Sequence, residues 1–434
     1  MSRMKTGKID WYERRHTKFD WKFDKSKLMI TGSDITQEQI DGLARYASAA
    51  EELFISCGWS FLREVLKGNR LGTLDGIDFS KYSNNESVRE LTIKGLDGTI
   101  DLSPFTQPSS IIVSIDDTPC LCDAYVANVT FPDSNRLESL LIHGNVEHDR
   151  KTIPLLPSLK SLTYHSLRES DLSWLNTSKS ITHVRVLRWV PEAVVLPSIS
   201  SLESITFAGG KKRNPKTLKS IDLSPLRASK DLKEVIFSKQ KISEVDFSPL
   251  STCSKLEHIS FEACNLTKVD LTPLEHLHLK KINLADNKIN ELVFPTRLTC
   301  ESLDISGNML ETIDLTPIVS SSLREINLGS RHLVDIDLTP LSACTSLESL
   351  GLEHSSLESI DLSPLSGLKN LRSFRITSKL MSKVDITPLL SCPALKDIKF
   401  GKIKPVANRK MLKEIQSPRL RKMKKKIKWQ RRLW

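Results

Sequence analysis

The chain has 434 residues, of which 39% are hydrophobic and 26% are charged, and its formal net charge is +11. One compact core stops growing below this length, so the chain is expected to form several domains or a repeat array. It has no run of 18 or more apolar residues, which argues against a membrane-spanning helix, and its start, MSRMKTGKIDWYERR, lacks the apolar segment of a secretory signal.

The first 76 residues are predicted to form a partly helical N-terminal cap. Residues 36–50 (TQEQIDGLARYASAA) carry apolar side chains on one face of a helix. Strands are predicted on either side of this helix, at 28–30 and 53–55. A second helical piece is expected around 59–66.

From residue 77 onward a short motif recurs, seen best as VDLTPL at 269–274. Its aspartates lie at 101, 222, 246, 270, 314, 337, 361 and 385, so the gaps after Asp222 are 24, 24, 44, 23, 24 and 24. A degenerate copy, LVFP at 292–295, divides the gap of 44. A fixed period in this range is typical of a repeat architecture.

Between these copies lies a second element, L-x-x-L-x-L, as in LEHISF from Leu256 and LESLGL from Leu347. Weaker copies extend back to Val88. The alternation with period two predicts a short strand with one buried face. One repeat of about 24 residues buries too few side chains to offset its loss of conformational entropy, so stacking of repeats is required.

Together the two elements resemble the leucine-rich repeat family, over roughly residues 77 to 401. This resemblance implies an α/β solenoid, a curved array with a parallel β-sheet on the concave face and short 3₁₀ or helical turns on the convex face. About 13 or 14 repeats are predicted over 77–404, followed by a basic C-terminal cap or tail helix at 405–434.

The repeated aspartate suggests a ladder of calcium ligands, but its neighbours lack the glycines that such sites need. Identical acids also provide no distinct acid and base for catalysis. Serine or threonine is a strong helix N-cap and proline is favoured at the first helical position. Each Ser/Thr-Pro pair is therefore predicted to open a convex-side turn rather than to be a phosphorylation site. For the aspartate, a bond from its carboxylate to the backbone of the next turn is expected.

Most of the eight cysteines fall on repeat positions that are predicted to be interior, which indicates reduced packing residues in a cytoplasmic protein. Cys120 and Cys122 form the one close pair, and a zinc site would need a second pair. No metal, cofactor or small-molecule substrate is predicted. The motifs GxxxxGK[ST], GxSxG and HExxH are absent from the sequence, so no enzyme is expected.

The resemblance implies that a protein partner binds on the concave face. The candidate residues occupy outward positions on or just after the predicted strands. They are Asn283, Glu325, Asn327, Glu353, His354 and Arg375. The alternative is a solvated sheet surface without a binding role. No large aromatic cluster marks an anchor for a partner.

The C-terminal segment 402–434 holds 14 Lys and Arg residues against one acid, Glu414, giving +13, so residues 1–401 sum to −2. The anionic-surface candidates are Arg421, Lys422, Lys424, Lys425, Lys426, Lys428, Arg431 and Arg432. Apolar residues recur among them near helical spacing, which predicts a basic amphipathic helix. Such a helix binds an anionic membrane, RNA phosphates or an acidic partner, or else only confers solubility.

The leading prediction is therefore a cytoplasmic, non-enzymatic scaffold that binds a protein on its concave sheet. The alternative is a binder of anionic surfaces, either RNA or acidic lipid, through the basic tail.

Overall fold

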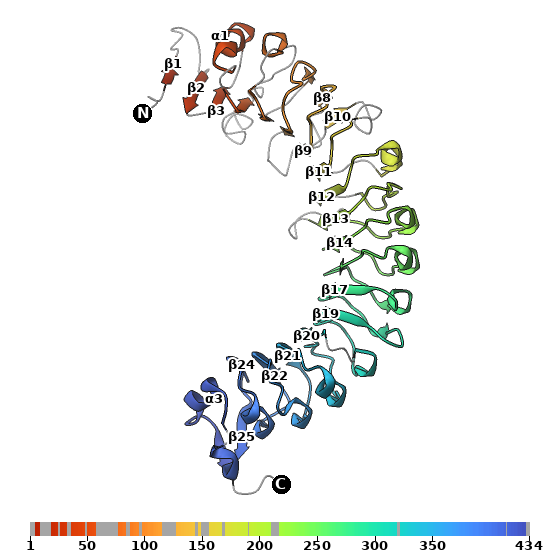
Figure 1. The fold of residues 1–434 in the computed structure, drawn as a ribbon, viewed down its shortest axis with the longest axis vertical. Coiled ribbons are helices and arrows are strands. Elements are labelled where there is room, and N and C mark those ends of the chain that lie inside the picture. Colours follow the sequence, from red (N-terminus) through yellow and green to blue (C-terminus); the bar gives the residue numbers. More distant parts are fainter. Residues whose placement is uncertain are drawn as a thin grey trace, which may run out of the picture. The chain divides into compact units, whose positions relative to one another are not determined.

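In a computed structural model, the chain divides into two compact units, residues 1–216 and 217–434 (Figure 1). The structure describes residues 5–8, 19–24, 27–32, 36–47, 50–57, 77–83, 87–94, 98–114, 127–143, 146–148, 156–166, 170–189, 191–209, 217–318, 322–413 and 415–430. The helical piece predicted at 59–66 and the Cys120–Cys122 pair lie outside these residues.

In the described part of unit 1–216, one α-helix accompanies a mainly parallel sheet. Its elements are β1 (Lys5–Lys8), β2 (Phe19–Asp24), β3 (Lys27–Gly32), α1 (Gln37–Ala47), β4 (Glu52–Cys57), η1 (Ser80–Tyr82), β5 (Glu90–Lys94), β6 (Gly98–Asp101), β7 (Ser110–Ser114), β8 (Ala127–Thr130), β9 (Ser139–His143), β10 (Val146–His148), β11 (Ser161–Ser166), η3 (Ser173–Thr177), β12 (His183–Trp189) and β13 (Ser204–Gly209). Strands β3, β4, β5, β7, β9, β11, β12 and β13 pair in parallel in that order, while β6, β8 and β10 form a second, smaller sheet.

In unit 217–434, short 3₁₀ helices alternate with strands. The elements are η4 (Ser224–Ala228), β14 (Glu234–Ser238), η5 (Ser248–Thr252), β15 (His258–Ser260), β16 (Lys268–Asp270), η6 (Thr272–Leu274), β17 (His278–Asn283), β18 (Glu291–Val293), β19 (Thr299–Asp304), η7 (Thr316–Ile318), β20 (Glu325–Asn327), η8 (Thr339–Ala343), β21 (Ser349–Ser355), η9 (Ser363–Leu365), β22 (Ser373–Ser378), β23 (Lys383–Asp385), η10 (Thr387–Ser391), β24 (Asp397–Lys399), β25 (Lys404–Asn408), η11 (Arg409–Lys413), α3 (Pro418–Met423) and β26 (Lys428–Gln430). Strands β14, β15, β17, β19, β20, β21, β22 and β24 form its parallel sheet.

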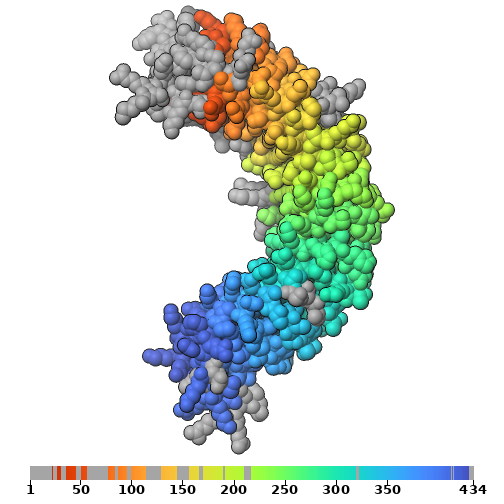
Figure 2. Space-filling view, in the orientation of Figure 1, coloured from red at the N-terminus to blue at the C-terminus, as the bar shows by residue number. Residues whose placement is uncertain are grey.

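The predicted L-x-x-L-x-L strands are confirmed. Neighbouring repeats pair in register, so that Ile282 of β17 lies between Ile259 of β15 and Leu303 of β19, and all three are almost fully buried. Within each unit the sheet strands lie on the inner side of the curve and the 3₁₀ turns on the outer side (Figure 1). The colours of Figure 2 follow the chain order along each unit, as expected when a repeat contacts mainly its neighbours.

The N-terminal helix and its flanking strands also agree with the sequence. Helix α1 begins with a capping box, in which Thr36 Oγ1 accepts from the Gln39 backbone N–H and Gln39 Oε1 accepts from the Thr36 N–H. Ile40 is fully buried, and its carbonyl accepts a 2.8 Å hydrogen bond from the Tyr82 hydroxyl. Because β3 pairs in parallel with β4, and β4 with β5, the sheet already runs through the region predicted as a cap. The domain boundaries themselves stay predictions.

The recurring aspartate caps the outer turn of its repeat. In each copy, one carboxylate oxygen accepts a hydrogen bond of 2.7–2.9 Å from the backbone N–H two residues further on, as in an Asx turn. The aspartates are Asp78, Asp101, Asp171, Asp222, Asp246, Asp270, Asp314, Asp337, Asp361 and Asp385. The expected bond from carboxylate to backbone is therefore confirmed.

The predicted N-cap role of the Ser/Thr hydroxyl in these repeats is wrong. Helix η6 begins at Thr272 itself, with Leu271 at the N-cap and proline second, and no side chain caps it in the usual way. The hydroxyl instead donates to the same aspartate, as Ser363 does to Asp361 at 2.6 Å. The N–H groups that a Thr272 cap would bind are those of Leu274 and Glu275, and they donate instead to the backbone carbonyls of Leu271 and Thr272.

The C-terminal segment is less helical than predicted. Helix α3 ends at Met423, and after a turn the chain forms β26, which pairs in parallel with β25. Ser417 does cap this helix, since its Oγ accepts from the Leu420 N–H. A longer helix is disfavoured because it would bring like charges together four residues apart, at Arg421 and Lys425 and at Lys422 and Lys426. Ile427 is buried where the chain turns into β26.

The five cysteines whose side chains the structure describes are buried free thiols: Cys253, Cys264, Cys300, Cys344 and Cys392. Burial raises the pKa values of Cys264 and Cys300 to about 12, so these thiols are poor nucleophiles. Their interior positions agree with the sequence. No helix in the described part of the chain is long and apolar enough to cross a membrane.

The first prediction concerns the Asx turn. Asp361→Ala removes the acceptor for the Ser363 N–H and should lower the free energy of unfolding, toward the lower end of roughly 0.5–2 kcal/mol because water screens this exposed site. Asp361→Asn keeps an oxygen in place and should lose less. Urea unfolding of both variants measures the difference, and equal losses would show that the hydrogen bond is unimportant.

The second prediction concerns pH. Hydrogen bonds from the side chain and then the backbone of the following Ser/Thr hold the pKa values of five aspartates below their usual range: Asp222, Asp246, Asp314, Asp337 and Asp361. A pKa lowered by folding gives stability that is complete above the unfolded pKa, about 3.9, and is lost as pH falls through the folded pKa. The urea concentration at the midpoint of unfolding should therefore decrease as the pH is lowered below about 4. The fivefold Asp→Asn variant should show a shallower fall, and an unchanged slope would contradict this assignment.

Candidate functional site

The candidate binding residues were predicted from the sequence to lie on the exposed strand face of unit 217–434. In β21 the partly exposed Ser349, Gly351 and Glu353 alternate with the buried Leu350 and Leu352. In-register pairing turns each outward repeat position into a row across the sheet. One such row contains Ser260, Asn283, Asp304, Asn327, Gly351, Arg375 and Lys399.

All six predicted residues lie on this face or at its edge. Asn283 ends β17, Glu325 and Asn327 are in β20, Glu353 and His354 are in β21, and Arg375 is in β22. The structure brings three of them, Asn327, Glu353 and His354, to one cavity. Asn283, Glu325 and Arg375 do not line that cavity. A binding role for the six stays a prediction.

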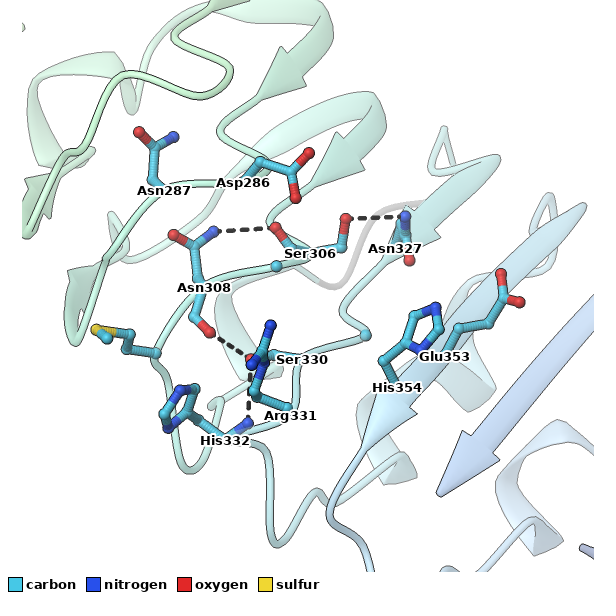
Figure 3. Close-up of a pocket in the computed structure, with 13 residues that line it drawn as sticks. Asp286, Asn287, Ser306, Asn308, Asn327, Ser330, Arg331, His332, Glu353 and His354 are labelled. Atoms are coloured by element: carbon cyan, nitrogen blue, oxygen red, sulfur yellow. Dashed lines mark hydrogen bonds between the residues drawn. The ribbon is translucent and has the colours of Figure 1, made fainter. Parts of the chain in front are cut away.

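The cavity has a volume of about 530 Å³ and lies where the chain leaves strands β17, β19, β20 and β21 (Figure 3). Asp286 and His354 have positive φ angles of 57° and 61°, and Gly307, at the position that matches Asp286 in its repeat, has φ 70°. These left-handed residues turn the chain away from the sheet at the same point of the repeats of β17, β19 and β21. The turns of successive repeats therefore lie side by side and enclose the cavity.

Two buried asparagines brace the cavity from the core side. Asn308 Nδ2 donates to the carbonyls of Leu284 and Ile305 at 2.9 and 2.8 Å, and its Oδ1 accepts from the Ile289 N–H. Asn287 makes the equivalent bonds one repeat earlier. Because the side-chain amides of both asparagines are already hydrogen-bonded to the backbone, these residues hold adjacent repeats together. Contacts to a ligand would therefore come from the residues of the rim.

The rim carries both signs of charge. Asp286 lies over Gly307, at a point where a Cβ on the glycine would approach Asp286 Oδ1 to 2.4 Å. Across the cavity, Glu353 pairs with Lys399 at 2.5 Å, beside His354 (Figure 3). Arg331 and His332 complete the basic part of the rim. The cavity thus offers donors and acceptors to a polar group.

Beyond the cavity, ion pairs cross the strand face. Arg375 Nε and Nη2 lie 2.7 and 2.5 Å from Asp397 Oδ2, and this guanidinium holds the pKa of Asp397 below its usual range. Asn327 Nδ2 donates to Asp304 Oδ2 at 3.2 Å. Exposed pairs of this kind contribute about 0–1 kcal/mol each, so they shape the charge pattern more than the stability.

Sequence reasoning did not assign Ser306, Asn308, Arg331 or His332 to a site. They follow the strand by a few residues, where the L-x-x-L-x-L pattern gives no information. The recurrence of asparagine at 287 and 308 was the available signal. In the described part of the chain, no group of three His, Cys, Asp or Glu side chains is arranged to hold a metal ion.

The basic tail residues are placed on a folded segment. Leu420 and Ile427 are buried, whereas the cationic side chains between 421 and 428 are exposed to solvent. Arg421 Nε donates to the Ile415 carbonyl at 2.9 Å. Arg431 and Arg432 lie outside the described residues. An anionic-surface role for this segment stays a prediction.

Comparison with known proteins identifies the family. Residues 192–296 and 287–410 match the family described as BspA type leucine-rich repeat region, in six copies, and together they cover just over half of the chain. The chain belongs to the BspA-type leucine-rich repeat family. No curated protein matches it in sequence.

Solved leucine-rich repeat structures share the fold. A leucine-rich repeat protein of Leptospira interrogans is 13% identical with a TM-score of 0.52, and the match covers 92% of this chain and 93% of that one. Drosophila Toll, in the Toll–Spätzle complex, is 13% identical with a TM-score of 0.53, over 94% of this chain and 53% of Toll. An internalin, InlF of Listeria monocytogenes, is 19% identical with a TM-score of 0.46, over 85% and 89% of the two chains. At such identities, the first two likenesses establish the solenoid fold alone.

The third prediction tests the packing of turns at the cavity. A Cβ at Gly329 would lie 2.2 Å from the Glu353 backbone oxygen, so Gly329→Ala should cost roughly 1–3 kcal/mol in the free energy of unfolding. Gly42→Ala is the control, because nothing lies within 4 Å of its Cβ and alanine should stabilise α1 by about 0.5–1 kcal/mol. Urea unfolding measures both. An unchanged Gly329→Ala would show that the turns are not in close contact.

Proposed function

We propose that the protein is a non-enzymatic interaction module that binds a protein partner on the exposed strand face of residues 217–434. The observation that carries this proposal is the joint contribution of neighbouring strands to one polar surface. Residues of β20 and β21 line a cavity formed by the turns of four repeats, and β22 continues the same face. Each repeat adds its own outward residues, so the surface extends as the array does.

The composition of the face supports a protein rather than a small substrate. The cavity opens beside the Glu353–Lys399 ion pair, and the Arg375–Asp397 pair lies beyond it on the same face, so positive and negative groups alternate there. Complementary charge on a partner would fix its register and exclude partners with the wrong pattern. The family and fold agree, since the structural neighbour Toll is seen in a complex with Spätzle.

The basic segment 419–428 is the second candidate, for an anionic surface. Its lysines are exposed on a segment fixed by buried Leu420 and Ile427, and no ion pair joins them to a carboxylate of the described residues. Removing the whole segment would uncover the last repeat, because Ser417 and Leu420 are fully buried. Charge reversal at Lys422 and Lys425 is therefore the better test, and it should abolish a salt-sensitive complex if the tail is the site.

The fourth prediction tests the strand face. A triple variant, Asn327→Ala, Glu353→Ala and Arg375→Ala, should weaken binding of a co-purified partner roughly tenfold or more. The matched control is Lys268→Ala with Glu291→Ala, which removes an exposed 2.7 Å ion pair between β16 and β18, outside the main sheet. Affinity purification followed by binding measurements on the identified partner would separate the two.

Three results are decisive. Loss of the partner in the triple variant but not in the control supports the strand face, provided that both variants keep the wild-type urea midpoint. Retention of the partner by the triple variant overturns the proposal. Loss of the partner only on charge reversal at Lys422 and Lys425 assigns binding to the tail instead.

A further inference from the structure

A row of apolar side chains crosses the exposed strand face of unit 1–216. The row follows the strand pairing from β3 to β11, and every member is half-buried. It consists of Met29, Phe54, Thr92, Ile112, Leu141 and Thr163. On either side of each member along its strand are core residues, such as Leu140 and Ile142 beside Leu141, which are almost fully buried. The row therefore points away from the core.

The fold does not require apolar residues at this repeat position. The same position, the middle of L-x-L, is apolar at Ile236 of β14 but is occupied by Ser260, Asn283, Asp304 and Asn327 in the strands that follow in unit 217–434, where the sheet is built in the same way. Thr92 and Thr163 show that a smaller, more polar residue is also accommodated within the row itself. Four large apolar side chains at this position thus cost solubility without serving the repeat core.

Lysines surround the aromatic member of the row. The ammonium groups of Lys27 and Lys94 lie 6.0 and 5.8 Å from the centre of the Phe54 ring. Lys27 is paired with Glu52 at 2.9 Å. Among the described residues no carboxylate pairs with Lys94. One cation beside the row is therefore available for an acidic group.

We infer that this row is a second docking surface, which takes a protein segment bearing a large aliphatic or aromatic side chain next to a carboxylate. The apolar side chain packs on Phe54, Ile112 and Leu141, and the carboxylate pairs with Lys94. An apolar centre with a charged rim is the usual anatomy of a protein interface. The surface is separate from the one proposed on residues 217–434 and does not depend on it.

The geometry favours a protein over a membrane. An apolar surface beside lysines is also what an anionic bilayer attracts. In unit 1–216, however, the sheet strands line the inner side of the curve (Figure 1). A planar bilayer cannot follow a concave face, whereas a protein segment can lie along it.

The fifth prediction tests this surface by peptide selection. A library of random displayed peptides is panned on the full-length protein, and the enriched peptides are synthesised and their affinities measured. Wild type should enrich peptides with Asp or Glu next to a large apolar residue. The variant Phe54→Thr, Ile112→Thr and Leu141→Thr should bind them roughly tenfold more weakly or worse. Threonine is chosen because Thr92 and Thr163 already occupy the row.

Controls separate docking from unfolding and from the other surface. Ile236→Thr makes the same chemical change at the same repeat position in β14, and it should leave peptide affinity unchanged. Asn327→Ala with Glu353→Ala and Arg375→Ala should also leave it unchanged, so failure of one surface is distinguishable from failure of the other. Lys94→Gln should weaken binding and remove most of its salt dependence.

Several results would overturn the inference. These are equal binding by the threonine variant, selection without enrichment of acidic residues, and an Ile236→Thr variant that loses affinity as much. Vesicles of phosphatidylserine and phosphatidylcholine provide the remaining arm. Sedimentation with these vesicles that depends on the apolar row would assign the surface to a membrane and reject the protein partner.

Discussion

In-register parallel pairing is the constraint on which the rest of the structure depends. Each L-x-x-L-x-L strand satisfies its backbone groups only by pairing with the strands of the preceding and following repeats. The same pairing stacks Ile259, Ile282 and Leu303 into one column of the core. A repeat on its own would leave the backbone N–H and C=O groups on both edges of its strand without a protein partner. Pairing every strand in register with both neighbours keeps the repeat length nearly constant. Once the inward positions are fixed in this way, the outward positions are free to vary.

The outer turn meets a second requirement, which is to reverse the chain within a few residues. The aspartate accepts the N–H of the Ser or Thr two residues further on, and the proline that follows has its own φ fixed by its ring at a helical value. Leu274 then enters the core at the end of a single turn. The copy at Asp171 makes the same Asx bond without a proline. The carboxylate is thus the common element, and the proline reinforces it.

Much of the fold could be predicted because the repeat period and the alternation of buried and exposed positions are visible in the sequence of each repeat. The strands, the N-terminal helix and the interior cysteines follow from alternation and spacing. The pattern does not predict the copy at Asp171, because that copy has Ser170 in place of the apolar residue before the aspartate and also lacks the proline. It predicts a longer helix in the tail because Leu420 and Ile427 are apolar in both arrangements. Pairing of β26 with β25 is a long-range contact that helical spacing cannot reveal.

The candidate sites were less predictable for a related reason. Outward positions on the strands could be read from the pattern, and Asn327, Glu353 and His354 do line the cavity. The cavity itself arises from left-handed turns after the strands and from the close approach of Gly329 to the next repeat, neither of which has a periodic signature.

The same repeat position carries mostly large apolar residues from β3 to β9 and polar residues from β15 to β20, and this difference is informative. Packing fixes whether a residue faces inward or outward, but it is indifferent to whether an outward residue is Leu141 or Asp304. Stability therefore cannot account for large apolar residues at this position in β3, β4, β7 and β9 and polar residues at it in β15, β17, β19 and β20. What remains is the chemistry of the surface that each row presents. A solenoid of near-identical repeats can in this way carry unlike binding surfaces, because its core and its exposed face are specified by alternate residues of the same strand.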